Sequence, residues 1–188
     1  MDRATMEGAC ASTERIINGV RPEDLSKPTP CTDWDVRALL NHVIGTLDLG
    51  AALLSDSKPT VNMAPGELPD ADLVGDDPAK AYRLGVETLL AAAAGDALER
   101  SHATPLGDMA GAVLGGFTTL DILVHGWDLA TATGQDPALP ADLAETVLAF
   151  ARQTITEDTR QPRIGPAIVV SPDATATARL VGFLGRQP

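Results

Sequence analysis

An acidic and an imidazole side chain stand four residues apart in the stretch DILVHGWDLATATG, which covers residues 121–134. In a helix, positions i and i+4 lie on the same face with their Cβ atoms about 6 Å apart, so Asp121 and His125 could hold one divalent ion between them. An ordinary hydrogen-bonded polar pair would show the same spacing. The choice between these two interpretations depends on whether further ligands come from elsewhere in the chain.

His42, in the segment ALLNHVIG, is the candidate third ligand. It lies at the edge of the apolar stripe of a predicted helix, a position from which a side chain reaches into the seam between two helices, where bundles build metal sites. Two histidines and one carboxylate bind divalent transition metals and leave coordination positions for water or substrate. The pattern alone leaves this metal site and hydrogen-bonded core histidines as equal alternatives. The remaining histidine, His102, falls in a stretch expected to be an exposed, solvated loop, and we do not assign it to the site.

Three residues near these ligands have two interpretations each. Asp128, three positions after His125, could accept a hydrogen bond from that imidazole and fix its tautomer, or could bond to a nearby loop or arginine. Trp127 could form a wall of the site or be plain core, as aromatic residues in bundles more often are. Asn41 could form a hydrogen bond near the site or face water.

The sequence gives no indication of a nucleophile. It contains no Walker pattern, no nucleophile elbow and no visible Cys–His arrangement. Cys10 and Cys31 form no CxxC motif, and we expect both to be small, partly buried residues with reduced thiols. No catalytic residue is therefore assigned.

Apolar periodicity and capping residues predict the helices that would position these side chains. The predicted helices cover residues 3–20, a segment capped by Thr32 or Asp33, a segment from the cap Asp77 to near Gly95, the segment from Ala110 to Gly134, and a segment after Pro140. Trp34 is expected to pack at the start of the second helix, and residues 55–77 form a long surface connection. The tail adds a short extended stretch at residues 168–170 and a last helix, begun by Ser171, Pro172 and Asp173. These elements predict one all-α domain over residues 1–188: a four-helix bundle with an additional C-terminal helical segment.

Charge and composition exclude several partners. The chain of 188 residues has a formal net charge of −12 and an isoelectric point near 4.5. Nucleic acids and anionic membrane surfaces both favour a basic face, so we expect neither as a partner. The N-terminal segment lacks the basic region and apolar core of a signal peptide, and we therefore expect a cytoplasmic protein.

Three segments also carry a resemblance to a known family; they read PTPCTDWDVRALLNHVIG, LDILVHGWDLATATG and IGPAIVVSPDATATARLVGFLGRQP. They closely resemble an actinobacterial family of small metal-binding proteins in the DinB/YfiT-like superfamily, related to the N-terminal domain of mycothiol-dependent maleylpyruvate isomerase. The likeness spans nearly the whole chain and is weakest over residues 55–77. It implies a DinB-like four-helix bundle. In that bundle His42, Asp121 and His125 match the first histidine, the carboxylate and the second histidine ligand of the family.

The chain departs from the isomerase in two respects. The isomerase has glutamate at the position of Asp121, so an ion would lie closer to this helix backbone or water would fill the gap. The isomerase also carries a C-terminal domain that contributes to its active site, and these 188 residues are too few to include one. The second departure argues against the isomerisation reaction itself.

The resemblance implies metal-dependent thiol chemistry. The expected function is that of an S-transferase or isomerase-like enzyme that joins mycothiol to a small electrophile, with zinc as the default ion and nickel, iron or manganese as alternatives. Two other functions remain open. One is a metal-dependent hydrolase with Asp128 as its base, and the other is a non-catalytic, metal-containing stress or binding protein, with a homodimer as its candidate assembly.

Overall fold

Four long helices form the larger of two compact units in the computed structural model of the chain, which describes residues 1–105, 107–160, 164–171 and 173–188. The larger unit covers Met1–Pro137 and the smaller unit covers Ala138–Pro188. The four helices of the larger unit are α1 (Arg3–Ile17), α2 (Val36–Leu54), α3 (Pro78–Ala92) and α4 (Gly111–Thr133). The predicted all-α, DinB-like bundle is confirmed. That residues 1–188 form one domain stays a prediction.

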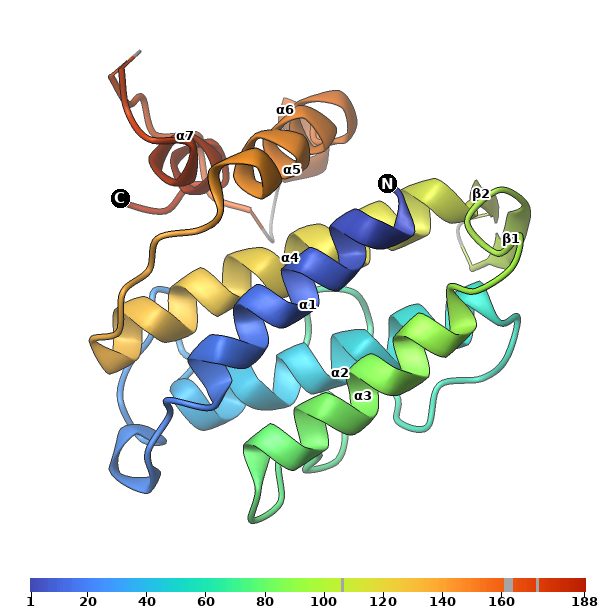
Figure 1. The fold of residues 1–188 in the computed structure, drawn as a ribbon, viewed down its shortest axis with the longest axis horizontal. Helices are drawn as coiled ribbons and strands as arrows, with labels where there is room; N and C mark the ends of the chain where they lie inside the picture. Colours follow the sequence, from blue (N-terminus) through green and yellow to red (C-terminus); the bar gives the residue numbers. More distant parts are fainter. Residues whose placement is uncertain (106, 161–163, 172) are drawn as a thin grey trace. The chain divides into compact units, whose positions relative to one another are not determined.

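Helix α4 is the central element of the bundle. It packs against α1 and α2, and α2 also packs against α3, as Figure 1 shows. Because α4 is apolar on nearly all sides, it is buried along most of its length, with Ile122, Leu123 and Leu129 fully enclosed. Polar side chains on such a helix are desolvated and need partners inside the protein.

The helix ends follow the capping rules, with one correction. Asp77 caps α3 and Gly134 ends α4 in the left-handed conformation, with φ of 72°, as predicted. The predicted cap of α2 is wrong: Asp35, and not Thr32 or Asp33, accepts the hydrogen bond from the Ala38 amide at 2.8 Å. The preceding loop remains non-helical up to Asp35, because Asp33 adopts a left-handed backbone with φ of 69° and Trp34 forms backbone hydrogen bonds to the loop residues Cys31 and Thr29.

The prediction of an exposed loop around His102 is also wrong. Two short antiparallel strands, β1 (Ser101–Thr104) and β2 (Gly107–Ala110), form a hairpin that places His102 in the interior, where it is 2% exposed. Its Nδ1 lies 3.0 Å from an Asp56 carboxylate oxygen and its Nε2 lies 2.7 Å from the Ala97 carbonyl oxygen. His102 therefore has a structural role away from the other two histidines.

The smaller unit is a helical segment of its own. It contains α5 (Ala141–Thr154), α6 (Glu157–Arg160) and α7 (Ala176–Phe183), and α5 packs against α7. Helix α7 begins later than predicted, with Thr175 as its cap; of the three residues expected to begin it, Pro172 lies outside the described residues. The segment 168–170 contacts α7 through the Ile168 amide, which donates to the Gly182 carbonyl, and no described residue pairs with it as a strand.

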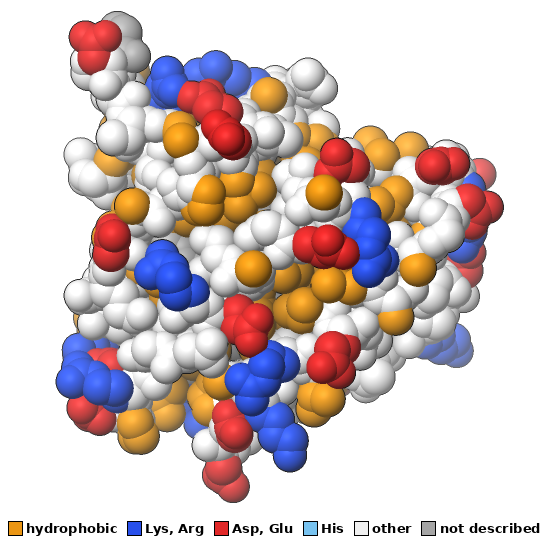
Figure 2. All heavy atoms as spheres, in the orientation of Figure 1, with side chains coloured by type: hydrophobic (Ala, Val, Ile, Leu, Met, Phe, Trp, Pro, Cys, Tyr) orange, Lys and Arg blue, Asp and Glu red, His pale blue; other side chains and the backbone are white. Residues whose placement is uncertain are grey.

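The surface carries mixed charge. Figure 2 shows acidic and basic side chains interspersed over the drawn face, and no basic patch gathers among the side chains described there. Several basic groups are paired with acidic ones, as Arg37 is with Asp72 and Arg100 with Asp56, both at 2.6 Å. Within the described ranges, every helix is too short or too polar to cross a bilayer.

A close approach of α1 and α4 fixes the helix that carries the candidate site. The Thr13 hydroxyl of α1 donates to the Ile122 carbonyl of α4 at 2.9 Å, and a Cβ on Gly126 would lie only 2.4 Å from that hydroxyl oxygen. Gly126 directly follows His125, so its missing side chain is what lets α1 lie against this part of α4.

Substituting Gly126 with alanine should destabilise the protein. The added methyl group meets the buried, β-branched Thr13, whose side chain cannot rotate away without losing its hydrogen bond. Overpacking of this kind costs about 1–3 kcal/mol, while the better helix propensity of alanine returns about 0.5–1 kcal/mol. We expect a net loss of up to about 2.5 kcal/mol in the free energy of unfolding, measured in urea. The double variant Thr13→Ala/Gly126→Ala should lose less unfolding free energy than the two single variants lose together. Losses that are strictly additive would contradict the clash.

Candidate metal centre

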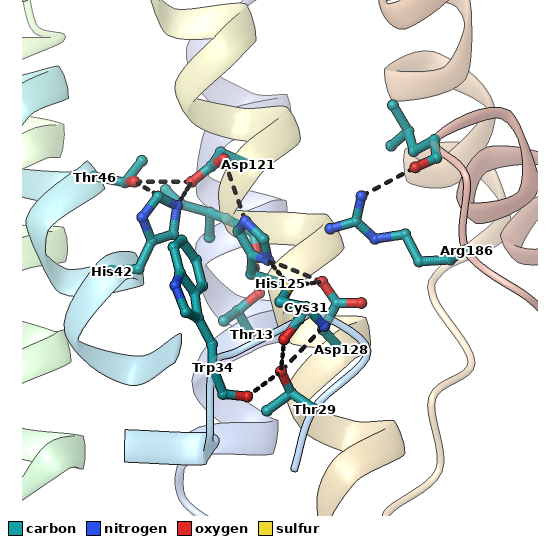
Figure 3. Close-up of polar contacts among 12 residues, drawn as sticks. Thr13, Thr29, Cys31, Trp34, His42, Thr46, Asp121, His125, Asp128 and Arg186 are labelled. Carbon is teal, nitrogen blue, oxygen red and sulfur yellow. Dashed lines mark hydrogen bonds and ion pairs between the residues drawn. The ribbon is translucent and has the colours of Figure 1, made fainter. Parts of the chain in front are cut away.

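His42, Asp121 and His125 converge between α2 and α4. The Nε2 atom of His42 lies 3.0 Å from Asp121 Oδ2, and the Nε2 atom of His125 lies 3.4 Å from Asp121 Oδ1. The two imidazole rings meet edge to face, with centroids 4.9 Å apart and planes inclined by 84°. Figure 3 shows both Nε2 atoms directed at the carboxylate, and one donor atom from each residue lies within 4.8 Å of the others.

The outer nitrogens of both rings are fixed by hydrogen bonds. His42 Nδ1 lies 2.6 Å from the Glu67 carbonyl oxygen, and His125 Nδ1 lies 2.9 Å from Asp128 Oδ2. These oxygens only accept, so each Nδ1 must carry a hydrogen and donate it. Each Nε2 then faces the centre of the site, which is the arrangement that outer hydrogen bonds give to metal-ligating histidines.

Asp121 is held in place and remains partly accessible. The Thr46 hydroxyl donates to Asp121 Oδ2 at 2.8 Å, which orients the carboxylate. The Asp121 side chain is 28% exposed, whereas those of His42 and His125 are 1% and 10% exposed. Of the three side chains, that of Asp121 is therefore the most accessible to solvent.

The electrostatics of the site favour positive charge at its centre. Burial raises the pKa of the Asp121 carboxyl, but the charges of His42 and His125 outweigh it and hold that pKa well below its usual range. Burial lowers the pKa of His125, but the Asp121 charge and the hydrogen bonds to Asp121, Asp128 and Cys31 together raise it well above 6.5. The same negative surroundings that retain a proton here would stabilise a bound cation.

The distances suit a divalent ion. With bonds of about 2.0–2.1 Å to nitrogen and oxygen, neighbouring ligands of a tetrahedral zinc ion lie roughly 3.3–3.4 Å apart. The contacts of 3.0 and 3.4 Å that Asp121 makes with His42 and His125 are close to this separation, but they use different carboxylate oxygens. With one donor atom from each residue within 4.8 Å of the others, the three side chains would have to draw together around a divalent ion.

A closed loop before α2 brings Cys31 and Trp34 to the site, although both were predicted only to be partly buried or packing residues. The Thr29 hydroxyl donates to the Trp34 carbonyl at 2.8 Å and accepts from the Cys31 amide at 3.1 Å, which closes the loop. The Trp34 ring lies against His42, with centroids 4.8 Å apart, and Cys31 Sγ lies 3.6 Å from His125 Nδ1. A Cys–His arrangement is thus present, contrary to expectation.

Asn41 and Trp127 do not reach the converging atoms. Asn41 donates to the Ala71 carbonyl at 3.0 Å and accepts from the Leu73 amide at 2.6 Å, so it ties the long connection between α2 and α3 to α2. That connection supplies the Glu67 carbonyl, so Asn41 acts on the site through the backbone. Trp127 is 5% exposed and belongs to the core, and the aromatic ring that covers the histidines is that of Trp34.

Asp128 combines both of its predicted roles: it is fully buried, accepts from His125, and also accepts from the Cys31 thiol of the loop at 3.4 Å. The substitution Asp128→Asn should lower metal affinity about 10–100-fold, because the neutral amide is a weaker acceptor for the His125 imidazole. Competition with a fluorescent zinc chelator measures this. His102→Gln, which alters a buried histidine bonded to Asp56 and to the Ala97 carbonyl, is the control. Equal affinities for Asp128→Asn and the unmodified protein would contradict the role assigned to Asp128.

Comparison with known proteins places the chain in a family. Two uncharacterized proteins of Mycobacterium tuberculosis, from strains CDC 1551 / Oshkosh and ATCC 25618 / H37Rv, are each 33% identical to the chain over 148 residues, 78% of this chain and 75% of each relative. No solved structure matches the chain significantly. The family model of the mycothiol maleylpyruvate isomerase N-terminal domain matches residues 6–130, the range that contains all three converging residues. The chain belongs to the mycothiol maleylpyruvate isomerase N-terminal domain family.

Proposed function

We propose that this protein is a divalent-metal-dependent enzyme of thiol chemistry, an S-transferase or isomerase-like enzyme that acts on mycothiol and a small electrophile. The observation that carries the proposal is the convergence of two imidazole Nε2 atoms on one carboxylate, with both Nδ1 atoms bonded outward. Membership of the family points to mycothiol as the thiol. Zinc is the default ion, with nickel, iron or manganese as alternatives.

The ligand set determines what a bound ion would do. A divalent ion in this set would act as a Lewis acid and favour the thiolate form of a thiol, which is the reactive form. Two neutral imidazoles and one carboxylate leave one positive charge uncompensated at the centre, which favours an anionic sulfur over a neutral ligand. Thr46 orients the carboxylate, and Trp34 covers the His42 ring on the side of the loop.

Turnover with a defined thiol tests this proposal. The full chain is loaded with Zn²⁺ and incubated with mycothiol and a broad panel of small electrophiles, and thiol-adduct formation is followed by mass spectrometry. We expect adduct formation above that of the metal-free protein, and a loss of this excess in Asp121→Ala. His102→Gln, which changes a buried histidine bonded to Asp56 and to the Ala97 carbonyl, serves as the control. Zinc binding without turnover on the whole panel would contradict the enzymatic proposal and favour a non-catalytic, metal-containing protein.

The hydrolase alternative receives no support from the position of its base. Asp128 is the candidate base for bound water in this alternative, but its carboxylate is bonded to His125 Nδ1 and to the Cys31 thiol. The opposite edge of the His125 ring, with Nε2, faces Asp121. A base for water would have to lie on that Nε2 side, so we do not propose hydrolysis.

A further inference from the structure

A second group of donor atoms lies on the other edge of the His125 ring. Cys31 Sγ is 3.6 Å from His125 Nδ1 and 3.4 Å from Asp128 Oδ2, and these last two atoms are 2.9 Å apart. Asp128 is fully buried, His125 is 8% exposed, and Cys31 is half-buried at the loop surface. Figure 3 shows the three side chains directed toward one another from the loop and from α4.

These separations resemble those around a tetrahedral ion with one sulfur ligand. Bonds of about 2.3 Å to sulfur and 2.0–2.2 Å to nitrogen and oxygen place the sulfur roughly 3.5–3.6 Å from its neighbouring ligands. Both observed sulfur distances are close to this value. The nitrogen and oxygen atoms would separate by about 0.5 Å, a movement within the range of small side-chain rotations.

The same geometry argues against a catalytic relay. In a nucleophile–base–acid relay, the thiol and the carboxylate bond to opposite nitrogens of the imidazole. Here both groups contact the same nitrogen, Nδ1, and the Cys31 thiol donates directly to the Asp128 carboxylate. A shared ligand position explains this arrangement better than proton relay does.

We propose that Cys31, His125 Nδ1 and Asp128 form a second cation position, selective for thiophilic ions such as Cd²⁺. A neutral imidazole offers a lone pair at only one nitrogen, so occupation of this position excludes the use of His125 Nε2 with His42 and Asp121. Soft thiolate favours soft ions, whereas the nitrogen and oxygen ligands on the other edge suit harder ones. This second position shares His125 with the proposed centre but does not depend on its function.

Cadmium titration of the full chain tests this inference. The thiolate-to-cadmium charge-transfer absorption in the ultraviolet reports sulfur ligation, and equilibrium dialysis reports the amount bound. We expect the band in the unmodified protein and its loss in Cys31→Ser. Cys10→Ala is the matched control and should retain the band, because Cys10 is 2% exposed in the core and burial raises its pKa to about 12. A band that survives in Cys31→Ser, or is absent from the cadmium-saturated unmodified protein, overturns the proposal.

Two further measurements separate this inference from the proposed function and from misfolding. His42→Ala removes a ligand of the proposed catalytic centre only, so it should keep the cadmium band; loss of the band in a folded His42→Ala protein overturns the second position. In the unmodified protein, Cd²⁺ should slow the alkylation of Cys31 by iodoacetamide, read by peptide mass spectrometry. An unchanged alkylation rate at saturating Cd²⁺ also overturns the proposed second cation position. Zinc-dependent turnover that is retained in Cys31→Ser leaves the proposed function intact in either case.

Discussion

Replacing His125 with alanine should abolish stoichiometric zinc binding. The unmodified chain is expected to retain about one ion, and the variant should bind it at least about 100-fold more weakly, since even outer hydrogen-bond partners contribute 10–100-fold. Among the residues that the structure describes, His125 belongs to both groups of possible ligands, so its loss leaves each group with two members. Elemental analysis of the dialysed protein measures the effect directly.

The chain offers its own controls for this experiment. The double variant His42→Gln/Cys31→Ser, which leaves neither group of donors complete, should lose the ion in the same way, because the amide cannot replace the Nε2 lone pair that faces Asp121. His102→Gln removes a histidine that is also buried but is bonded to Asp56 and to the Ala97 carbonyl, and it should keep the ion. Circular dichroism verifies the fold of each variant. Equal zinc content in folded His125→Ala and in the unmodified protein would refute the centre.

The convergence of the three candidate ligands could be predicted from the sequence because they lie on long helices. The apolar period of α2 and α4 is strong enough to place His42, Asp121 and His125 on faces that meet in a bundle. Spacing within α4 also predicted the bond between Asp128 and His125, since residues three apart share a helix face. For these residues, secondary structure alone determines which side chains can meet.

The remaining parts of the site come from irregular segments, in which no hydrophobic periodicity predicts where a side chain points. The Glu67 carbonyl that fixes His42 is a backbone group 25 residues away, and backbone oxygens carry no residue-type signal. Cys31 and Trp34 reach the site through a loop closed by Thr29, a geometry that depends on tertiary contacts. The buried position of His102 was missed because strands of four residues are too short to show alternation. For Cys31 the sequence does carry a signal, because this residue lies just before the cap of the helix that carries His42.

Raising the pH should destabilise the metal-free protein. His125 faces Asp121 and Asp128 on α4, His42 on α2 and Cys31 on the loop, and its pKa lies well above the ordinary value of 6.5. A raised folded-state pKa gives stability that is fully present below about pH 6.5 and is lost as the pH rises through the folded-state pKa. Between these two values, the free energy of unfolding should fall by up to about 1.4 kcal/mol per pH unit. Urea unfolding in the presence of a chelator measures this slope.

Saturating zinc should remove this slope. In the loaded protein His125 has already lost the proton, as has the unfolded chain above about pH 6.5, so unfolding no longer changes the number of bound protons. The difference in unfolding free energy between the loaded and the metal-free protein should therefore widen by up to about 1.4 kcal/mol per pH unit, which corresponds to a tenfold gain in zinc affinity.

Two other groups do not disturb this measurement. Cys10, whose pKa burial raises from 9.0 to about 12, affects stability only above about pH 9, so measurements between pH 6.5 and 8.5 are free of it. Asp121 stays ionised throughout this range, because its pKa lies well below its usual value. A metal-free protein whose stability is constant or rises with pH over this window would show that His125 does not hold its proton at the centre. In that case zinc would have no proton to displace there.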